Sequence, residues 1–144
     1  MSTILSRHFT LEELCQSSTA KKLGIKNTPG AQEIAYLTAL TTEVLEPLRE
    51  WYGKPIVVAS GYRCPMLNKA VGGVTNSQHM KGQAVDLFLD GDIEKGKKWF
   101  AYIRDHLPFD QLIMERNAKG TRWVHVSFDP MGNRKQVIND LVKK

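Results

Sequence analysis

The chain has little cysteine and no long hydrophobic segment. Its two cysteines, Cys15 and Cys64, are too few for a disulfide framework and lack the Cys-x-x-Cys spacing of a metal site. We expect free thiols, while the sequence leaves a single bridge between them open. No run of about 18 apolar residues occurs, which excludes a membrane-spanning helix. The first residues also lack the basic and apolar segments of a signal peptide, so we expect a soluble product made in the cytoplasm, for example in a phage-infected host.

Internal repeats, low-complexity segments and a dense basic stripe are absent as well. The formal net charge of +5 favours an anionic partner, which includes nucleic acid, a membrane surface and an acidic polymer such as bacterial cell wall. The lysines, however, are scattered in pairs without interleaved aromatic residues. This pattern is typical of solvated faces, so we expect no nucleic-acid partner and no membrane insertion.

The composition is that of an ordinary globular protein. Apolar residues make up 42% and charged residues 24% of the 144 residues. A chain of this size buries roughly 68–70% of its extended-chain surface on folding. We therefore expect a single domain over residues 1–144, and we expect it to be a monomer.

Several segments have helical signals. Thr10 begins a capping-box pattern, which predicts a short helix. Apolar residues recur at three- and four-residue steps over roughly residues 31–50, which predicts a long amphipathic helix. Asp92 can cap a further helix that extends to His106. A brief helix is also expected over residues 64–71.

Four apolar or alternating segments predict strands, at residues 56–59, 84–89, 111–115 and 122–128. The residues between the last two segments suit a hairpin loop. Runs of helix followed by runs of strand are typical of an α+β fold. We expect a small, mostly antiparallel sheet packed by helices.

Two histidines and an aspartate carry the strongest chemical signal. Asp86 lies in an apolar strand, where aspartate is disfavoured and costly to bury unless a cation accompanies it. His79 precedes it, and Gly82 between them permits a tight turn that returns the imidazole over the strand. His125 lies on the polar face of its own strand. Either histidine taken alone is more often structural, but two imidazoles and a carboxylate together are a ligand set of catalytic zinc.

Four motifs follow one another along the chain: Ser60-Gly61-Tyr62-Arg63, Leu67-Asn68-Lys69-Ala70-Val71-Gly72-Gly73, residues 77–86 and residues 123–128. Together they resemble the peptidase M15 family. This family includes zinc D-alanyl-D-alanine carboxypeptidases and phage L-alanyl-D-glutamate endopeptidases, and it shares its fold with the hedgehog signalling domain. The resemblance implies that His79, Asp86 and His125 bind one Zn²⁺ per chain.

The resemblance also implies roles for residues around the metal. Arg63 matches an arginine that binds or polarises the substrate, a task that suits its planar and permanently charged guanidinium. Ser77 and Gln78 would line the site, and Trp123 shares the face of His125. We therefore expect these four residues to bind substrate, with a surface ion pair as the alternative for Arg63 and a simple turn role for Ser77.

The general base departs from the family pattern. Many members have an acidic residue three positions before the last ligand histidine, where this chain has Arg122. Glu115 is the replacement candidate, because its strand is expected to pair with that of His125. An exposed position at the hairpin end is the alternative for Glu115. Asp110 and Asp129 are weaker candidates.

These expectations describe a zinc metallopeptidase, a peptidoglycan hydrolase that cleaves stem peptides containing D-residues. A phage-type lytic endopeptidase and a D,D-carboxypeptidase both fit, and the missing signal peptide favours an enzyme that acts on the cell wall after release. Arg122 keeps a second hypothesis open, a zinc-stabilised binding or assembly module without catalysis. A small basic nucleic-acid binder ranks below both.

Overall fold

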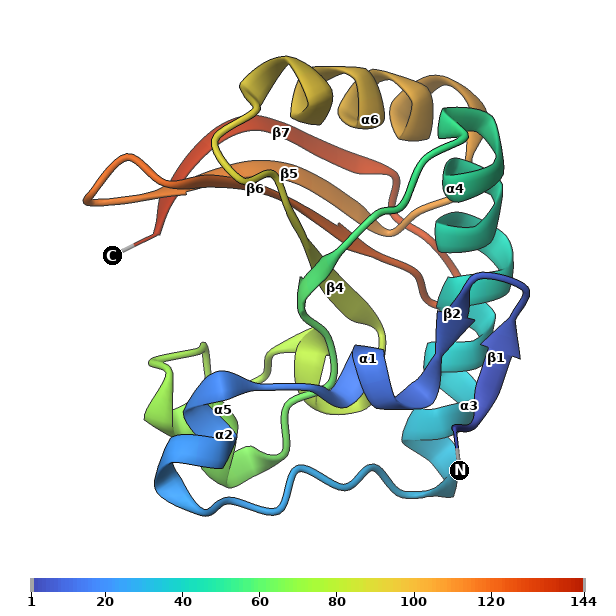
Figure 1. The fold of residues 1–144 in the computed structure, drawn as a ribbon. Coiled ribbons are helices and arrows are strands. Elements are labelled where there is room, and N and C mark those ends of the chain that lie inside the picture. Colours follow the sequence, from blue (N-terminus) through green and yellow to red (C-terminus); the bar gives the residue numbers. More distant parts are fainter. Residues whose placement is uncertain (1, 144) are drawn as a thin grey trace.

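The structure is a computed structural model that describes residues 2–143 and combines helices with a five-stranded sheet (Figure 1). The strands are β1 (Ile4–Ser6), β2 (Phe9–Thr10), β3 (Val58–Ser60), β4 (Ala84–Phe88), β5 (Gln111–Asn117), β6 (Arg122–Ser127) and β7 (Gln136–Lys143). The helical segments are α1 (Leu11–Cys15), α2 (Ser18–Leu23), α3 (Ala31–Leu40), η1 (Thr41–Leu45), α4 (Glu46–Tyr52), α5 (Pro65–Ala70), η2 (Gln78–Lys81) and α6 (Ile93–His106). Within residues 2–143, no helix has the length and hydropathy needed to cross a membrane.

The five-stranded sheet has the order β3-β4-β6-β5-β7. β5 and β7 run parallel, whereas all other neighbours in this sheet are antiparallel. β1 and β2 form a separate antiparallel pair. The expected α+β class with a mostly antiparallel sheet is therefore confirmed.

The long helix predicted over residues 31–50 is present as α3, η1 and α4 in direct succession. Its middle is a π-helical turn, in which Glu46 N donates to Thr41 O. Pro47 follows at once. Proline has no N–H to donate and its ring crowds the preceding turn, which accounts for the wider turn at this point.

The five-stranded sheet has an apolar face and a polar face. α6 and α4 cover the apolar face, and α6 lies along β5, β6 and β7 in Figure 1. The strand residues buried in the core on this side are Val85, Leu87, Leu112, Met114, Val124 and Val126. Because side chains alternate along a strand, Asp86, Glu115 and His125 project from the opposite face. The core therefore fixes the strands that carry these polar residues.

Two parts of the sheet differ from expectation. β3 lies slightly later than the predicted strand 56–59. β7 was not predicted at all, and its register with β5 shifts between the pairs Ile113–Ile138 and Glu115–Leu141. This irregularity interrupts the alternation of side chains, which explains why β7 lacks a clear strand pattern. Cys15 and Cys64 are free, as expected.

Gly82 ends η2 with φ +79°, and a Cβ there would lie 2.4 Å from the carbonyl oxygen of Glu33. Gly91 has φ +78° but no heavy atom within 4 Å of such a Cβ. We expect Gly82→Ala to lower the free energy of unfolding of the apoprotein by about 2–4 kcal/mol, because a backbone clash adds to left-handed strain. Gly91→Ala has the strain alone and should lose about 1–2 kcal/mol. Denaturant unfolding measures both, and equal losses would contradict the role of the close approach to Glu33.

Candidate metal centre

The turn before β4 brings His79 over the sheet. Ser77 caps η2, because its Oγ accepts a hydrogen bond of 3.1 Å from His79 N. Gly82 then reverses the chain into β4, which carries Asp86. Asp86 lies directly opposite His125 of β6 in the antiparallel ladder. Two segments far apart in the sequence thus deliver the three residues to one point.

The hydrogen bond of His79 fixes which ring nitrogen can bind a metal. His79 Nδ1 lies 2.7 Å from the carbonyl oxygen of Gly61. A carbonyl oxygen can only accept, so Nδ1 carries the proton and Nε2 has a free lone pair. Nε2 lies 3.5 Å from Asp86 Oδ2. A backbone carbonyl that orients an imidazole in this way is typical of metal-binding histidines.

Potential ligand atoms of His79, Asp86 and His125 converge on one point. His125 Nδ1 lies 3.0 Å from Asp86 Oδ1, and one ligand atom from each of the three residues lies within 4.8 Å of the others. All three side chains are buried. A lone pair that faces a buried carboxylate is unfavourable without a cation, so this donor group suits a metal ion.

The protonation states of the group also suit a metal. Burial lowers the pKa of His79, which favours the neutral imidazole that a metal requires. Burial alone would raise the pKa of Asp86, but its electrostatic interactions with His79 and His125 outweigh burial and lower the pKa. The pKa of Asp86 therefore lies well below its usual range, and the carboxylate is ionised at neutral pH.

Glu115 lies beside the metal group, on the same face of the sheet. It pairs with Trp123 in the β5–β6 ladder, and its Oε1 lies 3.6 Å from His125 Nδ1. Glu115 is only 9% exposed, which excludes the alternative of an exposed hairpin-end residue. Burial and the charge of Asp86 raise its pKa. A carboxylate with a raised pKa in this position is a good candidate for proton transfer.

Arg63 follows the edge strand β3 and contacts the same group. Its backbone N donates to His79 O at 3.0 Å, which ties it to η2. The side chain is 6% exposed, and its Nε is buried without a hydrogen-bond partner among residues 2–143. Asn27 supports this segment, because its side chain bonds Tyr62 O and Cys64 N. Arg63 is thus a rigid donor and not a surface ion pair.

The predicted substrate-binding residues do not all line one cavity. A cavity of about 580 Å³ contains the metal group, Glu115, Arg63, Ser77 and Gln78 along its wall. Trp123 is not part of that wall, although it lies opposite Glu115 in the ladder. Its role in binding stays a prediction. Arg134 and β7 also line the cavity, and the sequence patterns did not point to them.

Arg122 lies on the other face of the sheet. It lines a different pocket together with α6 residues such as Phe100 and Arg104. The reason is the alternation along β6, which places Arg122 and His125 on opposite faces. An acidic residue at this position of a regular strand would not face the metal group. The presence of Arg122 at this position is therefore no evidence that the protein has lost its general base.

The α+β fold holds a buried His-Asp-His group in a cavity, and this group could bind a metal ion. A sequence model described as peptidase M15 matches residues 7–127. Because the match spans most of the chain, the protein belongs to the peptidase M15 family. A comparison with curated proteins gave no match. The family and the metal group together support a peptidase.

We expect His125→Ala to reduce the zinc content of the protein from one ion per chain to a small fraction, because two remaining ligands cannot hold it tightly. His106→Ala is the matched control, since His106 packs on Tyr102 away from the metal group. Atomic absorption after dialysis measures both variants. Full zinc content in His125→Ala would remove His125 from the ligand set.

Proposed function

We propose that the protein is a zinc metallopeptidase that cleaves stem peptides of peptidoglycan. The observation that carries the proposal is the convergence of His79, Asp86 and His125 on one buried point beside Glu115 and Arg63. Tetrahedral zinc ligands at about 2.0–2.1 Å from the ion lie roughly 3.3 Å apart. Asp86 approaches the histidines through different oxygens, with Oδ1 3.0 Å from His125 Nδ1 and Oδ2 3.5 Å from His79 Nε2, and one ligand atom from each of the three residues lies within 4.8 Å of the others, which brings all three within reach of one ion.

Zinc bound there supplies a Lewis acid and makes a water molecule acidic near neutral pH. Glu115 is the proposed general base. It accepts the proton of the attacking water and returns it to the leaving amine. The burial that raises the pKa of Glu115 brings it closer to the working pH, which makes both proton transfers easier.

Arg63 is the proposed residue that stabilises the negative charge of the transition state. When water adds to the peptide carbonyl, negative charge develops on the oxygen, and the guanidinium donates hydrogen bonds to it. Support comes from the unpartnered Nε of Arg63, which is buried beside the metal group. Since β3 and Asn27 hold this segment in place, little reorganisation is needed during the reaction.

The proposed substrate class rests on the family and on charge. Peptidase M15 membership supports a peptide substrate, and the net charge of +5 suits an anionic cell wall. A phage-type endopeptidase and a D,D-carboxypeptidase both fit the site. In either case we propose that the protein acts on the wall after release from the cell in which it is made.

We expect Glu115→Gln to keep one zinc ion per chain and to lower kcat on purified cell walls by at least about 100-fold, because the base is lost while shape and metal ligands stay. The matched control is Asp129→Asn, which removes a carboxylate outside this cavity. Metal content and the decrease in wall turbidity are measured together. Undiminished hydrolysis by Glu115→Gln would exclude Glu115 as the base.

The same assay separates the enzyme from the second hypothesis. Wild-type protein that binds zinc but does not solubilise walls would support a zinc-stabilised binding module. Mass spectrometry of fragments from a defined muropeptide identifies the bond that is cut.

A further inference from the structure

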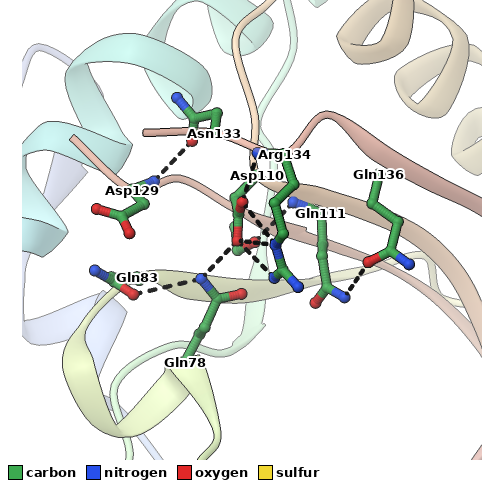
Figure 2. Close-up of polar contacts among 9 residues, drawn as sticks. Gln78, Gln83, Asp110, Gln111, Asp129, Asn133, Arg134 and Gln136 are labelled. Carbon is green, nitrogen blue, oxygen red and sulfur yellow. Dashed lines mark hydrogen bonds and ion pairs between the residues drawn. The ribbon is translucent and has the colours of Figure 1, made fainter. Parts of the chain in front are cut away.

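Arg134 is held at the edge of the cavity by a buried aspartate (Figure 2). Its Nε and Nη2 donate to Asp110 Oδ1 and Oδ2 at 3.0 and 2.7 Å, and its backbone N donates to Asp110 Oδ1 at 2.8 Å. Asp110 is 4% exposed, and its contacts with Arg134 hold its pKa at about 2. The aspartate therefore stays ionised and fixes the guanidinium in one orientation.

Asp110 leaves part of the guanidinium free. An arginine side chain has five N–H donors, and these contacts use Nε and Nη2 only, so both donors of Nη1 stay available. The side chain of Arg134 is 59% exposed, while that of Asp110 is 5% exposed. The aspartate is thus behind the guanidinium, and the free donors face solvent at the cavity.

Gln78 connects Arg134 and Asp110 to the metal group. Its Nε2 donates to Asp110 Oδ2 at 3.0 Å, and the residue directly precedes His79. Figure 2 shows the amide of Gln78 beside the guanidinium of Arg134, with Gln111 nearby. Gln78, Gln111 and Arg134 all line the cavity, and they form a wall of hydrogen-bonding groups at this end.

Arg134 and its neighbours are within reach of a peptide bound at the metal group. Gln111 lies two positions along β5 from Ile113, which pairs with His125. At the rise of a strand this corresponds to roughly 7 Å, or one to two residues of an extended substrate. Apart from Asp86 and Glu115, which face the metal position, the charged residues that line the cavity are cationic: Arg63, Arg134 and Lys143.

We propose that Arg134, oriented by Asp110 and flanked by Gln78, is a specificity-determining residue that binds a carboxylate of the substrate one to two residues from the bond that is cut. The proposal rests on the proposed function for the nature of the substrate. Asp110 is a positioning residue in this arrangement. Asp110 is a poor candidate for the general base, because its lowered pKa makes it a weak base, both of its oxygens already accept hydrogen bonds from Arg134 and Gln78, and it does not line the cavity.

The experiment uses the zinc-loaded protein and the peptide L-Ala-D-γ-Glu-L-Lys-D-Ala-D-Ala, which contains both the L-Ala-D-Glu bond and a D-Ala-D-Ala bond, with each of its two carboxyl groups converted to a carboxamide in turn. Dissociation constants are measured by calorimetry in the Glu115→Gln background, and kcat/KM is measured with intact Glu115. We expect the protein to prefer one free carboxylate over its amide, and we expect Arg134→Gln to reduce that preference roughly 10- to 100-fold. Arg134→Lys should restore part of it, since charge is kept but the planar fork is lost.

Arg116→Gln is the matched control. Arg116 forms the same type of fork with Asp140 between β5 and β7, with Nε–Oδ1 3.0 Å, but it does not line the cavity. The Arg116→Gln variant should leave the preference for the free carboxylate unchanged. The proposal is overturned if the parent protein binds no peptide, or if it binds the free-carboxylate and carboxamide peptides equally. It is also overturned if Arg134→Gln changes the preference for the carboxylate neither in the dissociation constant nor in kcat/KM. Binding that depends on Arg134 without any cleavage would support the carboxylate site and refute the peptidase.

Discussion

The site depends on the unfavourable meeting of electron pairs around Asp86. The carbonyl oxygen of Gly61 accepts a hydrogen bond from the only ring N–H of neutral His79, so the other ring nitrogen faces Asp86 with a lone pair. The antiparallel register of β4 and β6 places His125 against the same carboxylate. A buried group of this kind is costly by itself and becomes favourable when a cation joins it. Folding therefore forms a group whose electrostatic cost a bound cation would offset.

The polar face of the sheet arranges the remaining groups around that centre. Glu115 reaches it across the β5–β6 ladder, and Arg63 reaches it from the segment after β3. Each side chain is fixed by backbone that also packs the core on the opposite face. Short-range contacts of this type keep donors and acceptors in place before substrate arrives, which is the basis of electrostatic catalysis.

Much of this arrangement could be predicted from the sequence, because the informative residues differ from the apolar residues usual at such strand positions. Asp86 stands out in an apolar strand, and the alternation along residues 122–128 assigns His125 to the polar face. The start of α6 follows from its cap at Asp92. β7 could not be predicted, because its irregular register hides the alternation. Arg134 lies in a loop without periodicity, and only the tertiary fold brings Asp110 to it.

Arg134 and β7 line the cavity but lie outside residues 7–127, the part that matches the family. The proposed metal ligands and the proposed base, by contrast, all precede residue 127 in the sequence. In the proposed site, substitutions after residue 127 would therefore alter which peptides are accepted while the proposed metal ligands and base stay unchanged. Exchange of this terminal segment between family members would accordingly change selectivity separately from the proposed chemistry.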